Sequence, residues 1–176
     1  MPSFHHRSNK RELLDEPDIP FDAIRKNMEE LDTINRLLGG HKVTIAGLRS
    51  IMGKERLEAP LSIVEIGCGG GDNLRAIKQW AARKGLPVRL SGIDMNPNCI
   101  RFAQSVRGNA GIFFSCSDYR DAVFEASPDI IFSSLFCHHF NEDELVAQLQ
   151  WLRENCRRGF FINDLHRHPL AYHSIR

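Results

Sequence analysis

An acidic residue followed by three alternating glycines is the stretch of the sequence best suited to ligand chemistry, in the pattern Glu65-x-Gly67-x-Gly69-x-Gly71. Glycine lets the chain turn tightly and leaves the backbone open to close approach by a ligand. An apolar run, 61–66, precedes the pattern and is typical of a buried parallel strand. A helical pattern follows it. A strand, a glycine-rich turn and a helix in this order form the nucleotide-binding half of a doubly wound α/β sheet.

The glycine spacing bears on which nucleotide cofactor is bound. The dinucleotide fingerprint is G-x-G-x-x-G, and Gly67 and Gly69 fit its first two positions. The third position is Asp72, so a nicotinamide-dependent oxidoreductase is the alternative rather than the leading interpretation. Asp72 or Asn73 is also placed to cap the helix that follows the loop.

A second carboxylate supports a nucleoside ligand. The stretch 89–93 is interpreted as the second strand and ends at Asp94, a little over twenty residues after the last glycine. A carboxylate at this position accepts hydrogen bonds from both ribose hydroxyls, each worth about 1.5–3 kcal/mol. Its other interpretation is a cap for the next helix, but Asn96 supplies that cap better, just before Pro97.

The pattern from Glu65 to Gly71 resembles motif I of the class I S-adenosylmethionine-dependent methyltransferases. That cofactor has no pyrophosphate but carries an ammonium group. The carboxylate of Glu65 would attract this ammonium through its charge and through hydrogen bonding. In the family, an acidic residue after the third strand takes the adenine amino group, and Asp118 occupies that position. The resemblance implies S-adenosylmethionine as the cofactor, held by Glu65, Gly67, Cys68, Gly69, Gly71, Asp94, Met95, Asp118 and Tyr119. A non-catalytic module that binds the cofactor or a protein on the same fold is a further alternative.

The remaining elements alternate between strands and helices along the chain. Further strands are predicted at 112–116, 129–135 and 159–163, and helices at 21–38, 43–52, 97–107 and from about 142 to 156. The predicted fold is a doubly wound, mostly parallel sheet of the Rossmann-like methyltransferase type. The family continues past the fifth strand with a helix and an antiparallel strand pair, and Arg176 comes too soon for these, so we expect the C-terminal strands to be lacking.

The domain organisation follows from this reading. Residues 1–20 are charged and interrupted by proline, and are expected to form an exposed arm. Residues 21–58 are expected to form N-terminal cap helices, which in the resembling family cover the cofactor and shape the acceptor site. Residues 59–176 are expected to form the cofactor-binding α/β core, and we expect this core to be truncated at its C-terminal end.

The composition of the chain bears on which kinds of partner it binds. The chain has 176 residues and a formal charge of +1, with no basic block, which gives nucleic-acid binding no support. No apolar stretch approaches the length of a membrane span, and the first residues lack the apolar region of a signal peptide. We expect a cytoplasmic monomer or homodimer that acts on a small molecule. The five cysteines have no C-x-x-C pairing, and no three histidines have a spacing that predicts a metal site.

Histidines after the last two strands are candidates for a catalytic base. Methyl transfer is an in-line displacement, and a hydroxyl acceptor must also lose a proton. The candidates near the carboxyl edge of the sheet are His138, His139, Asp164, His166 and His168, of which we select His166 and His139. The stretch 163–172 resembles a segment of methyltransferases for bacterial phenolic and polyketide-type molecules. That resemblance implies a phenolic hydroxyl as the methyl acceptor.

Overall fold

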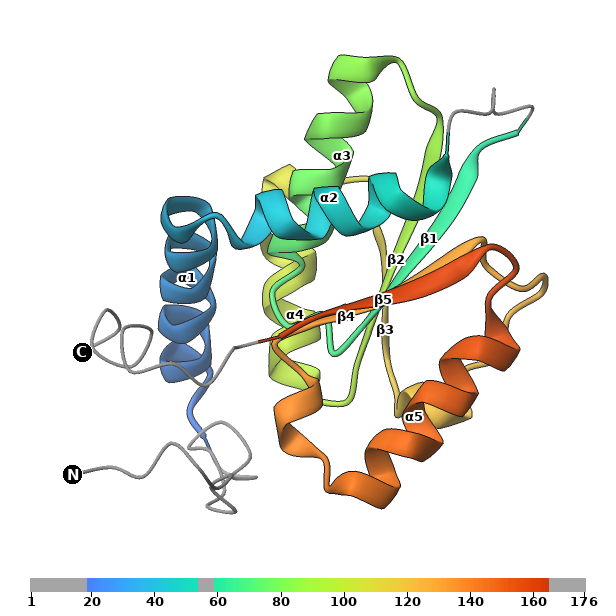
Figure 1. Ribbon diagram of the computed structural model, residues 1–176. Helices are drawn as coiled ribbons and strands as arrows, with labels where there is room; N and C mark the ends of the chain where they lie inside the picture. The colour runs from blue at the N-terminus through green and yellow to red at the C-terminus, as the bar shows by residue number, and fades with distance from the viewer. Residues whose placement is uncertain (1–18, 54–58, 165–176) are drawn as a thin grey trace.

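The computed structural model describes residues 19–53 and 59–164. Within them the helices and strands alternate as the sequence predicts (Figure 1). In chain order they are α1 (Phe21–Leu38), α2 (Gly40–Met52), β1 (Leu61–Ile66), α3 (Asp72–Lys84), β2 (Val88–Asp94), α4 (Pro97–Ser105), β3 (Phe113–Cys116), β4 (Ile130–Ser134), α5 (Glu142–Asn155) and β5 (Gly159–Asn163).

The five strands form one parallel sheet in the order β3-β2-β1-β4-β5. The chain first builds outward from β1 to β3 and then crosses back to place β4 on the other side of β1. This reversal lies beside the carboxyl end of β1, where open α/β sheets bind their ligands. The predicted doubly wound parallel fold is confirmed, and β5 is the last strand of the described residues.

Helices cover both faces of the sheet (Figure 1). One face packs on α2, α3 and α4 through a core that includes Leu48, Leu74 and Ile100. The other face packs on α5 through Leu152. Helix α1 lies outside these layers and packs on α4, where Ile24 and Met28 join Phe102 in a separate cluster. Through Met28, α1 also borders the loop that follows the carboxyl end of β1.

Local sequence signals explain most of the boundaries. Asn96 caps α4 by accepting a hydrogen bond from the backbone of Asn98, as predicted. Asn141 and Glu144 form both bonds of a capping box at the start of α5. The prediction for α3 is wrong in one respect. Neither Asp72 nor Asn73 caps that helix, because Gly71 occupies the cap position. The Asp72 side chain binds α1 and α2 instead, and the Asn73 side chain binds Glu65.

Several expectations fall outside the described residues. These are almost all of the predicted arm at 1–20, and everything after Asp164, including the candidates His166 and His168. Among residues 19–53 and 59–164, no helix combines the length and the apolar character needed to cross a membrane.

Candidate cofactor site

The glycine loop connects β1 to α3 and turns through three left-handed residues. Gly67, Gly69 and Gly71 have φ angles of 65°, 48° and 71°, a region that side chains disfavour. The loop is also crowded. A Cβ atom on Gly67 would lie 2.4 Å from Phe136 Cδ2, and one on Gly71 would lie 2.7 Å from Phe114 Cζ. Both the backbone conformation and the space around it therefore require glycine at these positions.

Cys68 lies within the loop but faces the sheet. Its side chain is 3% exposed, and a Cβ atom on Gly92 of β2 would lie 2.7 Å from its Sγ atom. Burial raises the pKa of the Cys68 thiol well above its usual range, so the thiol stays protonated. Cys68 is in the predicted loop, and its small side chain fits the narrow space above β2.

Asp94 joins the end of β2 to the glycine loop. The backbone N–H of Gly69 donates to Asp94 Oδ2 at 2.8 Å, and the N–H of Asn96 donates to Oδ1 at 2.8 Å. Burial raises the pKa of this carboxyl group above its ordinary value, and these two bonds oppose the rise. An ionised carboxylate has about four acceptor positions, so two remain for further donors such as ribose hydroxyls.

Glu65 lies beneath the loop and is 1% exposed. Its Oε1 atom accepts from Asn73 Nδ2 at 3.0 Å, while its Oε2 atom is buried with no hydrogen-bond partner among the described residues. Burial, together with the charge of Asp72, raises the pKa of Glu65 well above its usual range. A buried acceptor without a donor is costly, so the hydrogen bonding of Glu65 is incomplete within the described residues.

The predicted adenine side of the site lies at the end of β3. Asp118 follows β3, but its carboxylate is bound by the Arg120 side chain at 3.0 Å and by the Arg120 backbone N–H at 2.9 Å. The Arg120 guanidinium holds the pKa of Asp118 below its ordinary value. Tyr119 is nearly buried, and its ring packs edge-on against Trp151. Met95, beside Asp94, is 70% exposed and offers an apolar surface at this edge.

The turn after β4 carries backbone strain. Leu135 has a φ angle of 53°, and it is the one residue other than glycine in the described part of the chain with a positive value. Such a conformation costs about 1–2 kcal/mol for a side chain like leucine and is concentrated at functional sites. It turns the chain so that the next residue, Phe136, packs against Gly67. The strained turn therefore brings the histidine segment to the glycine loop.

Two predicted catalytic candidates are joined across the edge of the sheet. Asp164, just after β5, accepts from the backbone N–H of His138 at 3.0 Å and contacts His138 Nδ1 at 2.9 Å. The selected candidate His139 is exposed, and its ring centroid lies 4.4 Å from that of His138. His139 is also close enough to Asp94 for its charge to lower the pKa of that carboxyl group. The other selected candidate, His166, lies outside the described residues.

The N-terminal helices contact the glycine loop through residues that the sequence did not identify as part of the site. A Cβ atom on Gly69 would lie 3.1 Å from Met28 Sδ of α1. Asn35 of α1 and His41 of α2 both bind Asp72 Oδ2, at 2.9 Å and 2.8 Å. These contacts join segments more than thirty residues apart, for which the sequence offers no local signal.

Taken together, the donors and acceptors at this edge fit a nucleoside that carries a cationic chain. Asp94 has acceptor positions at the place predicted for ribose. Glu65 lies beneath the loop with one oxygen unpartnered among the described residues, and the exposed side chain of Met95 offers a surface for a flat base.

Comparison with known proteins agrees with this geometry. A family model described as a methyltransferase domain matches residues 63–159, which is more than half of the chain. No curated protein sequence matches.

Solved structures of methyltransferases share the fold. The plantazolicin methyltransferase BpumL in complex with a pentazolic desmethylPZN analogue and SAH is 26% identical, with a TM-score of 0.60 over 87% of this chain and 55% of that one. The same enzyme with a monoazolic analogue and SAH is 27% identical, with a TM-score of 0.56 over 83% and 52% of the two chains.

A more distant structure shares the fold alone. PKMT2 from Rickettsia typhi in complex with AdoHcy is 17% identical, with a TM-score of 0.52 over 65% of this chain and 24% of that one. The chain spans about half the length of the BpumL structures. On the strength of the family match and the sheet order, the chain belongs to the methyltransferase-domain family and has the Rossmann-like fold of the class I S-adenosylmethionine-dependent methyltransferases.

Proposed function

We propose that the chain binds S-adenosylmethionine and transfers its methyl group to the hydroxyl of a small aromatic molecule. The observation that carries the cofactor assignment is the bond from the Gly69 backbone to Asp94, which brings the glycine loop and the ribose acceptor into one site. In this proposal Glu65 binds the ammonium group, Asp94 accepts hydrogen bonds from the ribose hydroxyls, and Met95 packs against the face of the adenine. Asp118 and Tyr119 are proposed for the adenine edge, where Asp118 would have to share its carboxylate with Arg120.

Aromatic side chains support an aromatic acceptor. Phe136 and Phe140 are half-buried at the turn after β4, and their ring centroids lie 4.9 Å apart in an edge-on arrangement. Phe136 also contacts the His139 ring, at 6.2 Å between centroids. A planar acceptor gains from such surfaces through edge-on or offset stacking. The acceptor would thereby lie next to the histidine segment and the glycine loop.

The pair His138 and Asp164 is the proposed base. A carboxylate only accepts hydrogen bonds, so Asp164 fixes the proton of the imidazole on Nδ1 and leaves the lone pair on Nε2. Nε2 takes the acceptor's proton while the acceptor oxygen attacks the methyl carbon. The bond from that carbon to sulfur breaks, and its electron pair remains on sulfur. His138 then releases its proton to solvent. His139 and His166 are the competing assignments for this role.

A methylation assay with matched asparagine variants tests this proposal. The full chain is incubated with S-adenosylmethionine and a panel of substituted phenols, and products are detected by the mass gain of one methyl group. His138→Asn keeps a donor to Asp164 but removes the Nε2 base, so kcat should fall about 10²–10⁴-fold. Cofactor affinity should stay unchanged.

The competing assignments predict different outcomes. A loss confined to His139→Asn or to His166→Asn would move the base to that residue. Methylation of a desmethylPZN analogue, the compound crystallised with BpumL, without methylation of any phenol would show that the phenolic acceptor is wrong.

A further inference from the structure

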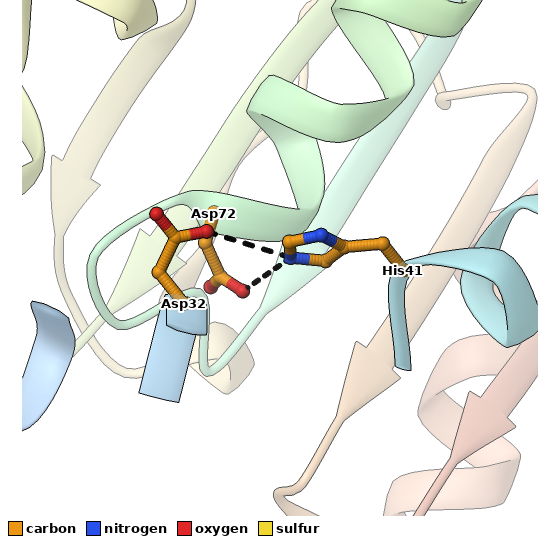
Figure 2. A group of neighbouring side chains, drawn as sticks. All are labelled: Asp32, His41 and Asp72. Carbon is orange, nitrogen blue, oxygen red and sulfur yellow. Dashed lines mark hydrogen bonds and ion pairs between the residues drawn. The ribbon is translucent and has the colours of Figure 1, made fainter. Parts of the chain in front are cut away.

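A polar junction joins the two N-terminal helices to the end of the glycine loop (Figure 2). His41, in the first turn of α2, directs Nε2 at Asp72 Oδ2, 2.8 Å away, and at Asp32 Oδ1 of α1, 3.8 Å away. Asp72 directly follows Gly71 and begins α3. Asn35 of α1 donates to the same oxygen of Asp72 at 2.9 Å. One carboxylate beside the loop therefore receives hydrogen bonds from both helices.

Two further chains of hydrogen bonds lead from the same helices to the loop. In the first, Asp32 binds Arg75 at 2.7 Å, Arg75 binds Asn109 at 2.8 Å, and Asn109 donates to the carbonyl of Gly70 at 3.1 Å. Asn109 is 3% exposed, whereas the side chain of Asp32 is 39% exposed, so the chain of bonds is shielded from water at its loop end. The bond from Asn109 to Gly70 is consequently stronger than it would be on the surface.

The second chain reaches the underside of the loop. Thr44 of α2 donates to Asn73 at 3.1 Å, and Asn73 donates to Glu65 at 3.0 Å. Thr44 is fully buried. The helices are thus bonded to residues on both sides of Gly69, the glycine whose N–H binds Asp94.

We propose that His41 is a positioning residue for the cofactor loop, acting through its bond to Asp72, and that the α1–α2 pair thereby sets the affinity for S-adenosylmethionine. This inference rests on the proposed function. Because a carboxylate only accepts, His41 Nε2 carries the hydrogen of the short bond. That bond holds α2 beside Asp72, the bond from Asn35 holds α1 there, and α1 carries Met28 onto Gly69 and Gly70. Loss of the bond between His41 and Asp72 should lower the affinity for S-adenosylmethionine, because binding of this cofactor must then also order the loop.

A metal ion is the competing explanation of the cluster. One nitrogen of His41 and one oxygen each of Asp32 and Asp72 lie within 4.8 Å of one another, a spacing that three ligands of one ion can adopt. Two observations favour the hydrogen-bonded junction. Asp72 already accepts from Asn35, and the guanidinium of Arg75 lies on Asp32, where it would repel a cation. The Arg75 guanidinium already pairs with Asp32, as expected for a carboxylate that binds no metal ion.

Calorimetric titration of the full chain with S-adenosylhomocysteine tests this inference. His41→Ala should weaken binding about tenfold, the value of one charge-assisted bond. His41→Gln should restore most of the affinity, because its amide nitrogen can stand where Nε2 stands. Lys42→Ala, an exposed neighbour in the same helix, should match the unaltered chain. Turnover at saturating S-adenosylmethionine should be almost the same in all four proteins, so that KM changes and kcat does not.

The possible outcomes separate the competing explanations. Equal affinity in His41→Ala would overturn the positioning role. Equal weakening in His41→Ala and His41→Gln, or loss of binding by the unaltered chain in EDTA with recovery on adding Zn²⁺, would also overturn it, the latter in favour of a metal site. His41→Asn, which is too short to reach Asp72, replaces His41→Ala if that variant does not fold. An unaltered chain that binds neither form of the cofactor would refute the proposed function as well.

Discussion

Replacing Gly67 with alanine combines two separate costs that the structure allows us to estimate. The first is the backbone, because φ of Gly67 is 65° and a side chain in that region costs about 1–2 kcal/mol. The second is the collision of the new Cβ with Phe136, whose Cδ2 and Cγ atoms would lie 2.4 Å and 2.6 Å away. Moving a packed ring costs about 1–3 kcal/mol. The free energy of unfolding should therefore fall by about 2–5 kcal/mol, a large part of the 5–15 kcal/mol typical of a domain.

Gly85 offers a matched control. Its φ angle is 62°, close to that of Gly67, but nothing lies within 4 Å of the Cβ that alanine would add. Gly85→Ala should therefore show the backbone cost alone, about 1–2 kcal/mol. Urea unfolding of both variants, followed by circular dichroism, measures the difference.

A double-mutant cycle isolates the collision. In a Phe136→Ala background the ring is gone, so Gly67→Ala should cost no more there than Gly85→Ala costs in the unaltered chain. If Gly67→Ala and Gly85→Ala have the same cost with Phe136 present, then the contact between the loop and the strained turn does not exist as described. In that case the placement of the histidine segment beside the loop would also be in doubt.

Two further predictions concern stability. Because burial raises the pKa of Glu65 in the folded chain, its contribution to stability should be fully present below the ordinary glutamate pKa and be lost as pH rises towards the raised value. Across that rise in pH the unaltered chain should lose stability relative to Glu65→Gln in urea unfolding, whereas parallel pH profiles would contradict the burial of this carboxyl group. Asn141→Ala should lower the free energy of unfolding by about 1 kcal/mol through loss of the α5 cap, as thermal or urea unfolding can show, and an unchanged value would mean that the capping box contributes nothing.

Elements with a strong local signal could be predicted from the sequence. The strands 61–66 and 159–163 were placed with the bounds that the structure has, since apolar runs bounded by glycine or polar residues mark buried strands. The cap at Asn96 could also be predicted, because it depends on a residue only two positions away. The carboxylate at Asp94 could be placed at the sheet edge because β2 ends there.

Contacts between distant segments could not be predicted. Nothing near Asp72 in the sequence indicates that its side chain binds Asn35 and His41 rather than capping its own helix. Likewise, the sequence analysis selects His139 rather than His138, and only the left-handed turn at Leu135 and the position of Asp164 point to His138 instead. Gln148 is fully buried on α5 although its type predicts exposure, and its Oε1 atom binds Cys137.

The most direct test of the account is calorimetric titration of the chain with S-adenosylmethionine and, separately, with NAD, repeated on Asp94→Ala. The carboxylate of Asp94 links the loop to the ribose position, so S-adenosylmethionine should bind the unaltered chain and NAD should not. Asp94→Ala should fold normally yet bind the cofactor at least tenfold more weakly, as expected for the loss of hydrogen bonds to a charged group. Binding of NAD alone, or equal affinity for S-adenosylmethionine with and without Asp94, would contradict the cofactor assignment.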